Sequence, residues 1–561
     1  MNDKIKRLKP YKATDPVNTV NKIRDVLNSL GLHLIETTVK CDTPFHSTIL
    51  SIKNPENDQI IFSTYGKGSS DEWASASAWG EMIERIQNIA FYMILIYPAC
   101  PENDDCEIDE FKYFPDERIF TLGAQSDFKF EENFKNLTKN KDDEIVNDKK
   151  IIGVPFFSVF DNTIEYLPFR ALQVIVGSNG MCSGNTRDEA LIQGISEIFE
   201  RHVLKSFYLH PYTPPDIPLE YFDDTEISNT IFTLQKQFGY SIQIKDCSMG
   251  KGYPVIGVLI KNKDNYYAFH LGADPSPITA LERCFTEMYQ GGNICFQSIT
   301  ELYENSPYDI HADFWKKNLS MTIKSYAGQW PNSILYDESS YEFLGFEHPE
   351  SISDHIDLQY LLMILKRDER RIYIRDNSFL GIPSYYIYIP GMSEISNFPD
   401  NKFSTCYLNF DKFIPVITKL KNSGCKDRQE MMRNLSEYIY FSPSKQFNAN
   451  EYLRFFQNHF VAQLMSDKFL NLIDFSLLGG RICDHYTDKE IKSNPFLDLI
   501  YKCDMTFKPS EIFNYLNLPN CFHCDTCNYS DCNLPFIKLI WKRMKERMKL
   551  TLRDQSNIFN Q

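Results

Sequence analysis

The spacing of hydrophobic positions alternates between helical and extended patterns along the chain. Apolar residues recur at helical spacing over residues 19–30, whereas residues 46–52, 253–260 and 371–374 have the pattern of strands. After about residue 435 the pattern becomes mostly helical. Because helix and strand patterns are mixed before that point, the sequence predicts an α+β core followed by a mostly helical C-terminal region.

These changes in pattern divide the chain into four segments. Residues 126–150 are highly charged and poor in branched apolar residues, which is typical of an exposed insertion or loop. We expect the first part of the core over residues 1–125, its main part over 151–435 and the helical region over 436–561. Within the last region, residues 535–550 place apolar side chains along one stripe of a helix and Lys and Arg elsewhere. A core-facing helix is expected there, with an RNA- or ribosome-contacting helix as the alternative.

An internal repeat runs through the predicted core. Residues 68–85 (GSSDEWASASAWGEMIER) recur as residues 184–201 (GNTRDEALIQGISEIFER), and a weaker third copy covers residues 276–290. The two strong copies share the first glycine, one alanine (Ala74 and Ala190) and the final Glu-x-x-Glu-Arg. Each copy also contains a pair typical of a helix-capping box. The pairs are Ser69 and Glu72, Thr186 and Glu189, and Thr279 and Glu282. We therefore expect duplicated α/β units in which a loop leads into a helix.

The helices of the repeat carry acidic residues on one face. In the second helix the residues at helical spacing on this face are Glu189, Gln193, Glu197, Glu200 and Arg201. In the first helix Glu81 and Glu84 share a face. Carboxylates that face each other inside a fold repel unless cations neutralise them. Such hard oxygen ligands suit Mg²⁺, which often keeps waters and bridges to phosphates. The alternative is a capping role for Glu189 and a solvated helix face for the others.

Polar loops that contain glycine precede both strong helices. Residues 178–186 end at a helix N-terminus, where backbone N–H groups and the helix dipole favour phosphate binding. Residues 65–68 place Lys67 at the equivalent position before the first helix. A simple turn is the alternative for either loop. The sequence has no G-x-x-x-x-G-K-[ST] motif and no G-x-G-x-x-G motif after a strand, so neither a P-loop ATPase nor a dinucleotide-binding fold is indicated.

The segments described above resemble the signature of the YcaO family. The resemblance is carried by residues 178–203, by GKG…SASAWGEMIER, by ITALERCFTEMYQGG, and by residues 246–260 and 374–394. It covers roughly residues 10–400. It implies a YcaO-type fold that binds ATP and Mg²⁺, in which helices of an internal duplication supply the glutamates. It further implies an ATP-dependent enzyme that activates backbone amides or assists sulfur chemistry.

The resemblance also implies roles for individual residues. It assigns Mg²⁺ and the phosphates to Glu81, Glu84, Glu189, Glu197 and Glu200. It assigns contacts with ATP to Lys12, Thr19, Ser178, Asn185, Gln193, Arg201 and Arg283. As an alternative, Arg85 and Arg201 pair with the glutamates in a structural role.

Two features distinguish between branches of this family. Peptide-cyclising members often end in a proline-rich tail whose carboxylate lies in the active site, and residues 555–561 contain no proline. The overall layout resembles the stand-alone branch, which is accessory to β-methylthiolation of a small-subunit ribosomal protein. The chain lacks the C-x3-C-x2-C triad of radical-SAM enzymes, so it could assist a radical-SAM methylthiotransferase but could not replace it.

Two other functions are the alternatives to this accessory role. One is azoline or thioamide formation on a ribosomally made peptide, with an E1-like or TfuA-type partner. The other is a non-catalytic nucleotide-binding scaffold, against which the intact set of glutamates argues. A homodimer is left open.

Four of the 15 cysteines lie close together near the C-terminus, at Cys521, Cys524, Cys527 and Cys532. Thiolates at such density bind Zn²⁺ or an iron–sulfur cluster, and free thiols are the alternative. The spacing does not choose between the metals. Cys284 and Cys295 lie in apolar runs and are expected to be reduced core residues. This cysteine usage, with neither a signal peptide nor a membrane span, favours the cytoplasm.

Composition excludes some classes of protein. Hydrophobic residues make up 43%, charged residues 24% and aromatic residues 14% of the chain, as expected for a folded globular protein. The net charge of −16 argues against direct DNA binding, which requires a basic surface.

Overall fold

The chain folds into two compact units in the computed structural model. Unit 1 contains Met1–Asn88, Gly153–Asn397 and Glu546–Gln561, and unit 2 contains Ile89–Ile152 and Phe398–Lys545. The structure describes residues 4–39, 44–58, 60–89, 114–121, 150–210, 212–290, 294–298, 318–319, 321–323, 326, 328–394, 487, 489 and 534–559. The expected insertion, apart from Lys150, and the C-terminal cysteines lie outside these residues. The four-segment division of the chain remains a prediction.

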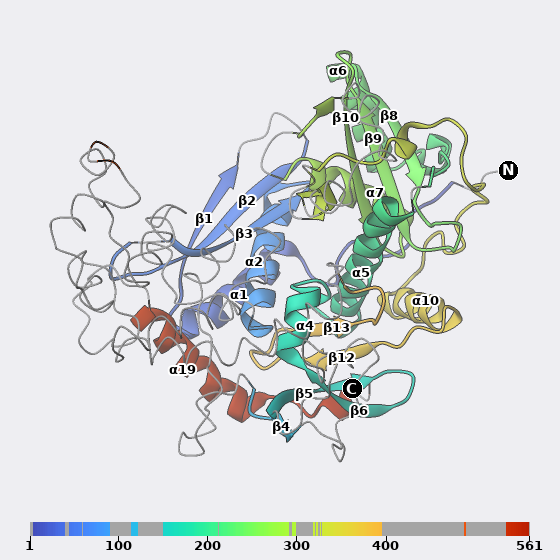
Figure 1. Ribbon diagram of the computed structural model, residues 1–561. Helices are drawn as coiled ribbons and strands as arrows, with labels where there is room; N and C mark the ends of the chain where they lie inside the picture. The colour runs from blue at the N-terminus through green and yellow to red at the C-terminus, as the bar shows by residue number, and fades with distance from the viewer. Residues whose placement is uncertain are drawn as a thin grey trace. The chain divides into compact units, whose positions relative to one another are not determined.

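The first sheet of unit 1 has three antiparallel strands. They are β1 (His33–Val39), β2 (His46–Lys53) and β3 (Ile60–Gly68), paired in that order. Helix α2 (Asp71–Gln87) packs on β2 and β3, and α1 (Pro16–Ser29) packs on α2 (Figure 1). The predicted helix and strand in this part are confirmed. Helix α1 begins before residue 19 because Asp15 caps it and Pro16 suits the first helical position.

The second sheet has four antiparallel strands in the order β11-β10-β9-β8. They are β8 (Ser241–Asp246), β9 (Val255–Lys261), β10 (Tyr266–Ala273) and β11 (Gln297–Ser298). Helix α7 (Pro277–Met288) packs on β9 and β10, and α6 (Glu226–Phe238) packs on α7 and β8. Cys284 is buried here, as expected. The same prediction for Cys295 was wrong, because this residue is exposed next to the short edge strand β11.

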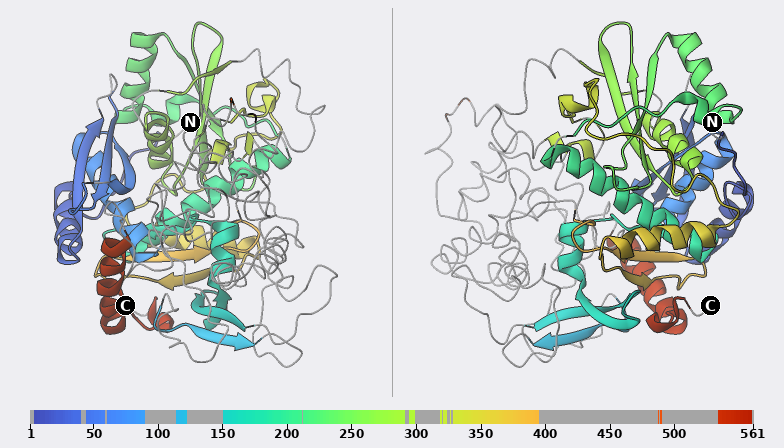
Figure 2. Two further views of the ribbon diagram at one scale, coloured as in Figure 1. Left: turned by 60° about the vertical axis from the view of Figure 1, so that its left-hand side comes forward. Right: turned by 90° about the vertical axis from the view of Figure 1, so that its right-hand side faces the viewer.

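The third sheet contains β5 (Lys150–Ser158), β12 (Tyr373–Asp376), β13 (Ser384–Tyr388) and β7 (Met181–Ser183) in that order, with β6 (Thr163–Pro168) paired to β5. Helix α5 (Arg187–Leu209) packs on β7 and β13, and also on β9 and β10 of the second sheet. Helix α10 (Asp354–Arg367) packs beside it (Figure 2). The apolar residues Leu191, Ile195 and Phe199 of α5 are fully buried. Helix α5 therefore joins two sheets through one core.

The remaining elements are short or lie near the C-terminus. They are β4 (Arg118–Thr121), α4 (Phe169–Val176), α19 (Leu534–Thr551) and the 3₁₀ turns Leu219–Phe222, Asn332–Leu335 and Gln555–Asn557. Helix α19 buries Ile537, Met544 and Met548 of the predicted apolar stripe, whereas Trp541, the fourth residue of the stripe, is half-buried. No helix among the described residues is both long and apolar enough to cross a membrane.

The predicted repeat appears as three units in which a strand leads into a helix: β3 with α2, β7 with α5, and β10 with α7. A glycine in each unit lies against an alanine of the following helix. A Cβ atom would come within 2.6 Å of Ala74 N if placed on Gly68, within 2.7 Å of Ala190 N on Gly184, and within 2.3 Å of Ala280 O on Gly272. The two strong copies therefore share the Gly68–Ala74 and Gly184–Ala190 contacts because strand and helix approach so closely. In the third copy Gly272 corresponds to Gly66, which meets Ala74 O in the same way.

The caps of these helices agree only partly with the predicted capping boxes. Thr186 caps α5 as predicted, and its hydroxyl accepts a hydrogen bond from Glu189 N at 3.2 Å. Helix α2 is capped by Ser70 instead of Ser69, and α7 by Ser276 instead of Thr279. The prediction for α7 was wrong because Pro277 starts the helix earlier and the Thr279 hydroxyl accepts a hydrogen bond from Arg7.

Candidate functional site

The three helices of the repeat surround a cavity of about 770 Å³, which is also lined by residues of an N-terminal arm (residues 4–15). The residues predicted for Mg²⁺ and ATP that line it are Lys12, Thr19, Glu81, Glu84, Asn185, Glu189, Gln193, Glu197, Glu200, Arg201 and Arg283. Ser178 is not among the lining residues, since it precedes β7, whereas Ser183 at the end of β7 lines the cavity. Residues from positions 12 to 283 of the chain thus meet in one place.

On helix α2 the acidic residues are paired within their own helix. The Arg85 guanidinium lies 3.1 Å from Glu81 Oε1 and 3.0 Å from Glu84 Oε1. Burial raises the pKa of Glu84 well above its usual range, although the charge of Arg85 opposes this. The structural pairing considered for Arg85 is therefore present.

On helix α5 the equivalent arginine has a different partner. The Arg201 guanidinium donates to the carbonyl oxygen of Ile323 at 2.6 Å, and Arg201 has no ion pair with the described residues. Burial raises the pKa of Glu197. Glu200 is 6% exposed and accepts a hydrogen bond from the Tyr326 hydroxyl at 2.8 Å. On α5 the arginine therefore acts on Glu197 through its charge, which opposes the rise in the pKa of that carboxyl, and not through a direct ion pair.

Positive groups lie across the cavity from these acids. Lys67 of β3 forms an ion pair with Glu287 of α7, and burial lowers the pKa of Lys67 to about 8. Arg283 donates a hydrogen bond to Gln193 Oε1 and lies 3.3 Å from Asp274 Oδ2. A cavity lined by both acidic and basic side chains fits a polyanion bound together with a cation.

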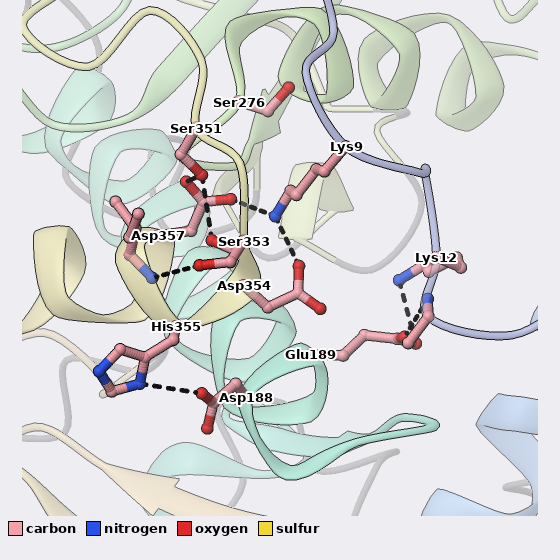
Figure 3. Close-up of polar contacts among 12 residues, drawn as sticks. Lys9, Lys12, Asp188, Glu189, Ser276, Ser351, Ser353, Asp354, His355 and Asp357 are labelled. Atoms are coloured by element: carbon pink, nitrogen blue, oxygen red, sulfur yellow. Dashed lines mark hydrogen bonds and ion pairs between the residues drawn. The ribbon is translucent and has the colours of Figure 1, made fainter.

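The N-terminal arm reaches this cavity through a series of polar contacts (Figure 3). Lys9 forms ion pairs with Asp354 and Asp357 at the start of α10. Lys12 Nζ lies 3.6 Å from Glu189 Oε1, and the backbone N–H of Ala13 donates to Glu189 Oε2 at 3.1 Å. This explains how a lysine far from the repeat in sequence joins the site.

Further lining residues were missed by the sequence analysis. The rings of Tyr11 and Trp73 meet edge to face at 5.1 Å, and the Arg7 guanidinium lies 5.1 Å from the centre of the Tyr11 ring. Arg7 also forms an ion pair with Glu282 at 2.7 Å. No motif marks Arg7 and Tyr11, for which the concentration of basic and aromatic side chains in the arm was the available signal. Trp73 and Glu282 lie within copies of the repeat, but no ligand role was predicted for them.

The lining residues fit Mg²⁺ and a nucleotide by their chemistry. No three His, Cys, Asp or Glu side chains within the described ranges are arranged to hold a metal ion by themselves. Mg²⁺ is usually bound by one or two carboxylates together with waters and phosphate oxygens. Carboxylates that share a cavity with lysine and arginine therefore suit a Mg²⁺–nucleotide pair better than a metal cage made only of protein.

Comparisons with known proteins agree with this interpretation. The family model described as YcaO cyclodehydratase, ATP- and Mg²⁺-binding, matches residues 65–393. This chain therefore belongs to the YcaO family, and the resemblance found in the sequence and the α+β fold are confirmed.

Two bacterial relatives match much of the chain. The ribosomal protein S12 methylthiotransferase accessory factor YcaO of Escherichia coli (strain K12) is 27% identical over 401 residues, which are 69% of this chain and 66% of that protein. A protein of Haemophilus influenzae is 28% identical over 391 residues, which are 67% of this chain and 65% of that protein. The chain thus spans just under two thirds of the length of each relative.

Solved structures with partial similarity to this chain are also known. One is a heterocyclase in complex with substrate and cofactor, with a TM-score of 0.47 and 17% identity, covering 69% of this chain and 54% of that one. Another is YcaO from Methanopyrus kandleri bound with AMPPCP and Mg²⁺, with a TM-score of 0.45 and 16% identity, covering 71% of this chain and 99% of that one.

Proposed function

We propose that this chain binds ATP with Mg²⁺ in the cavity between α2, α5 and α7 and uses it to activate a carbonyl oxygen of a polypeptide. The observation that carries the proposal is the convergence of five glutamates with Lys67, Arg201 and Arg283 on one cavity. Lysine and arginine offset the charge of phosphates, and glutamates hold the metal that neutralises the remainder. Mg²⁺, when bound, stabilises the negative charge that develops during phosphoryl transfer.

The proposed chemistry is phosphorylation of an amide followed by substitution. The amide oxygen forms a bond to the γ-phosphorus of ATP as the bond to ADP breaks. A nucleophile then bonds to the carbonyl carbon, and phosphate leaves with the former amide oxygen. In this proposal the cavity residues orient the phosphates of ATP, and the carbonyl oxygen of the substrate attacks the γ-phosphorus.

Replacing one glutamate tests the site directly. We expect the purified protein to hydrolyse ATP slowly and only with Mg²⁺, and Glu200→Gln to lose most of this turnover because one charged oxygen ligand is removed at constant size. Glu338→Gln is the control, since Glu338 is exposed and outside the cavity lining. Undiminished Mg²⁺-dependent hydrolysis in Glu200→Gln would show that the site is misplaced.

For the physiological role, we propose that the chain assists a radical-SAM methylthiotransferase in β-methylthiolation of a small-subunit ribosomal protein. The support is the similarity to the E. coli accessory factor over 69% of the chain. The expected partners are the methylthiotransferase and the ribosomal protein, and a cytoplasmic location stays a prediction.

The second candidate is azoline or thioamide formation on a ribosomally made peptide, with an E1-like or TfuA-type partner. It is favoured by the family model that matches residues 65–393, whose description names a cyclodehydratase. Intact-mass spectrometry of ribosomal proteins from a strain that lacks the gene distinguishes the two. The accessory role predicts loss of the methylthio group from the small-subunit protein, whereas a fully modified protein favours the peptide-modifying role.

A further inference from the structure

Tyr326 reaches the site from a segment that no sequence motif marks. Its hydroxyl donates to Glu200 Oε1 at 2.8 Å, although the two residues are 126 positions apart. Tyr326 is 8% exposed and Glu200 6% exposed. Glu200 has no other hydrogen bond or ion pair with the described residues. One oxygen of this carboxylate is therefore bound to the phenol, and the other has no protein partner in the described part of the chain.

The position of Tyr326 is determined by several neighbours. The His270 ring stacks on the Tyr326 ring with centroids 4.1 Å apart and an interplanar angle of 13°. The Gln297 amide donates to the carbonyl oxygens of Tyr326 at 3.4 Å and Gly328 at 2.7 Å. The Tyr267 hydroxyl donates a hydrogen bond to Gln297 Oε1 at 2.6 Å, which fixes the orientation of that amide. These contacts fix both the ring and the backbone.

The backbone of Tyr326 lies in the left-handed region, with φ of 52°. This conformation is unfavourable for a bulky residue with a Cβ atom, and it persists where the surrounding structure over-determines it. Strain of this kind gathers at functional sites. Here the strained residue is Tyr326, whose hydroxyl donates to Glu200 of the cavity.

Arg201, the residue next to Glu200, is bound by the same part of the chain as Glu200. Arg201 donates to Ile323 O, whereas its counterpart Arg85 pairs with Glu81 and Glu84 of its own helix. The Tyr326 segment, defined as the described residues among 318–330, therefore makes the two copies of the repeat unequal. The arginine of α5 donates to a backbone carbonyl and makes no ion pair with Glu197 or Glu200 in the described part of the chain, and Glu200 accepts a hydrogen bond from a phenol.

We propose that Tyr326 is a positioning residue that orients Glu200 for Mg²⁺, an inference that rests on the proposed function of the cavity. A hydrogen bond to one carboxylate oxygen restricts rotation of the side chain and would leave the second oxygen available to hold the metal. Hydrogen-bond partners of metal ligands usually contribute about 10- to 100-fold to metal affinity.

The test compares Tyr326→Phe with Tyr253→Phe. Both changes remove a buried hydroxyl that donates to a carboxylate, and Tyr253 also packs on α5, through Phe199, but bonds to Asp368 outside the cavity lining. Binding of the non-hydrolysable analogue AMPPCP is measured by calorimetry as a function of Mg²⁺, together with thermal unfolding of the ligand-free protein. We expect Tyr326→Phe to raise the Mg²⁺ concentration at half-saturation about 10- to 100-fold, with AMPPCP binding in the absence of Mg²⁺ unchanged. Tyr253→Phe should leave the Mg²⁺ dependence unchanged.

Two results would overturn the assignment of Tyr326. One is an unchanged Mg²⁺ dependence in Tyr326→Phe, and the other is an equal loss of Mg²⁺-free binding, which would indicate a structural role only. A double-mutant cycle gives a second measurement, because Tyr326→Phe should have no further effect on Mg²⁺ in a Glu200→Gln background. Failure of the wild-type protein to bind AMPPCP with Mg²⁺ would instead overturn the proposed function.

Discussion

Arg85 and Arg201 occupy the same position of the repeat but bind different groups. Arg85 pairs with two glutamates of α2, whereas Arg201 donates to the backbone of Ile323. Equal sequence motifs thus give unequal electrostatic surroundings. At the scale of residues, the charge available to a ligand depends on these partners more than on the residue types alone.

Lys67 is the residue whose charge is expected to respond to pH. Burial lowers its pKa to about 8, so the free protein loses this charge as the pH rises through that value. A bound phosphate favours the charged form and raises the pKa again. Nucleotide binding above pH 8 should therefore take up a proton, and affinity should fall by up to about tenfold per pH unit. Calorimetry in buffers of different ionisation enthalpy measures this uptake.

Two variants of Lys67 serve as controls for this prediction. Lys67→Arg keeps a charge that does not titrate in proteins, so the pH dependence above pH 8 should disappear. Lys67→Met should bind weakly at every pH for lack of the charge. Proton uptake that persists in both variants would assign the titration to another group.

At the scale of elements, the close approach of strand and helix positions the acidic faces. The Gly184–Ala190 contact places the start of α5 directly on the end of β7, so the glutamates that follow are fixed relative to the third sheet. The same arrangement in α2 and α7 brings the faces of all three helices to one cavity.

Alanine substitution of two glycines tests this packing. A Cβ atom on Gly184 would lie 2.7 Å from Ala190 N, so Gly184→Ala should destabilise the protein by about 1–3 kcal/mol. A Cβ atom on Gly80, inside α2, would come no closer than 3.9 Å to a described atom outside the helix, the Ser183 hydroxyl oxygen, so Gly80→Ala should stabilise the protein by about 0.5–1 kcal/mol. Urea unfolding measures both changes. Shifts of the same sign in the two variants would contradict the packing argument.

At the scale of the whole molecule, unit 1 is assembled from three separate stretches of the chain. The last stretch docks on β12, where the Gln555 amide accepts from Asp376 N at 2.7 Å and donates to Asp376 O at 3.1 Å. Gln555 is 4% exposed and lies 179 positions from Asp376. The C-terminal stretch is thus an integral part of the fold of unit 1.

Removing the Gln555 amide tests this long-range contact. Gln555→Ala leaves two buried backbone groups of Asp376 without this partner, which should cost about 1–3 kcal/mol of unfolding free energy. Ser556→Ala is the matched control, because the Ser556 side chain is exposed and bonds only to Asp554 in the described structure. Chemical denaturation should show a clear loss for Gln555→Ala only, and equal stabilities would contradict the docking role.

The C-terminal cysteine cluster, which lies outside the described residues, yields a prediction that concerns unit 2. Elemental analysis of protein purified without oxygen should give near one equivalent of zinc, or iron together with sulfide. Replacing Cys521 and Cys524 by serine should abolish this stoichiometry, because thiolate ligands are lost. Fully folded protein free of metal would favour unpaired thiols instead.

Much of the site follows from local sequence alone. The repeat, the Glu-x-x-Glu-Arg spacing and the glycine–alanine pairs are properties of neighbouring residues, and helical periodicity is enough to place the acids on one face. The family resemblance then connected Lys12, Thr19 and Arg283 to the same site, and each of them lines the cavity. Ser178 shows the limit of such matching, because Ser183 lines the cavity in its place.

Tertiary structure alone decided which groups neutralise and orient the acids. Ala13 donates to Glu189 across 176 positions, Arg201 to Ile323 across 122, and Tyr326 to Glu200 across 126. Sequence by itself determined the helices and their acidic faces because those depend on residues within a few turns. The partners of the acids depend on contacts between distant segments, which form only when α5 is enclosed by two sheets.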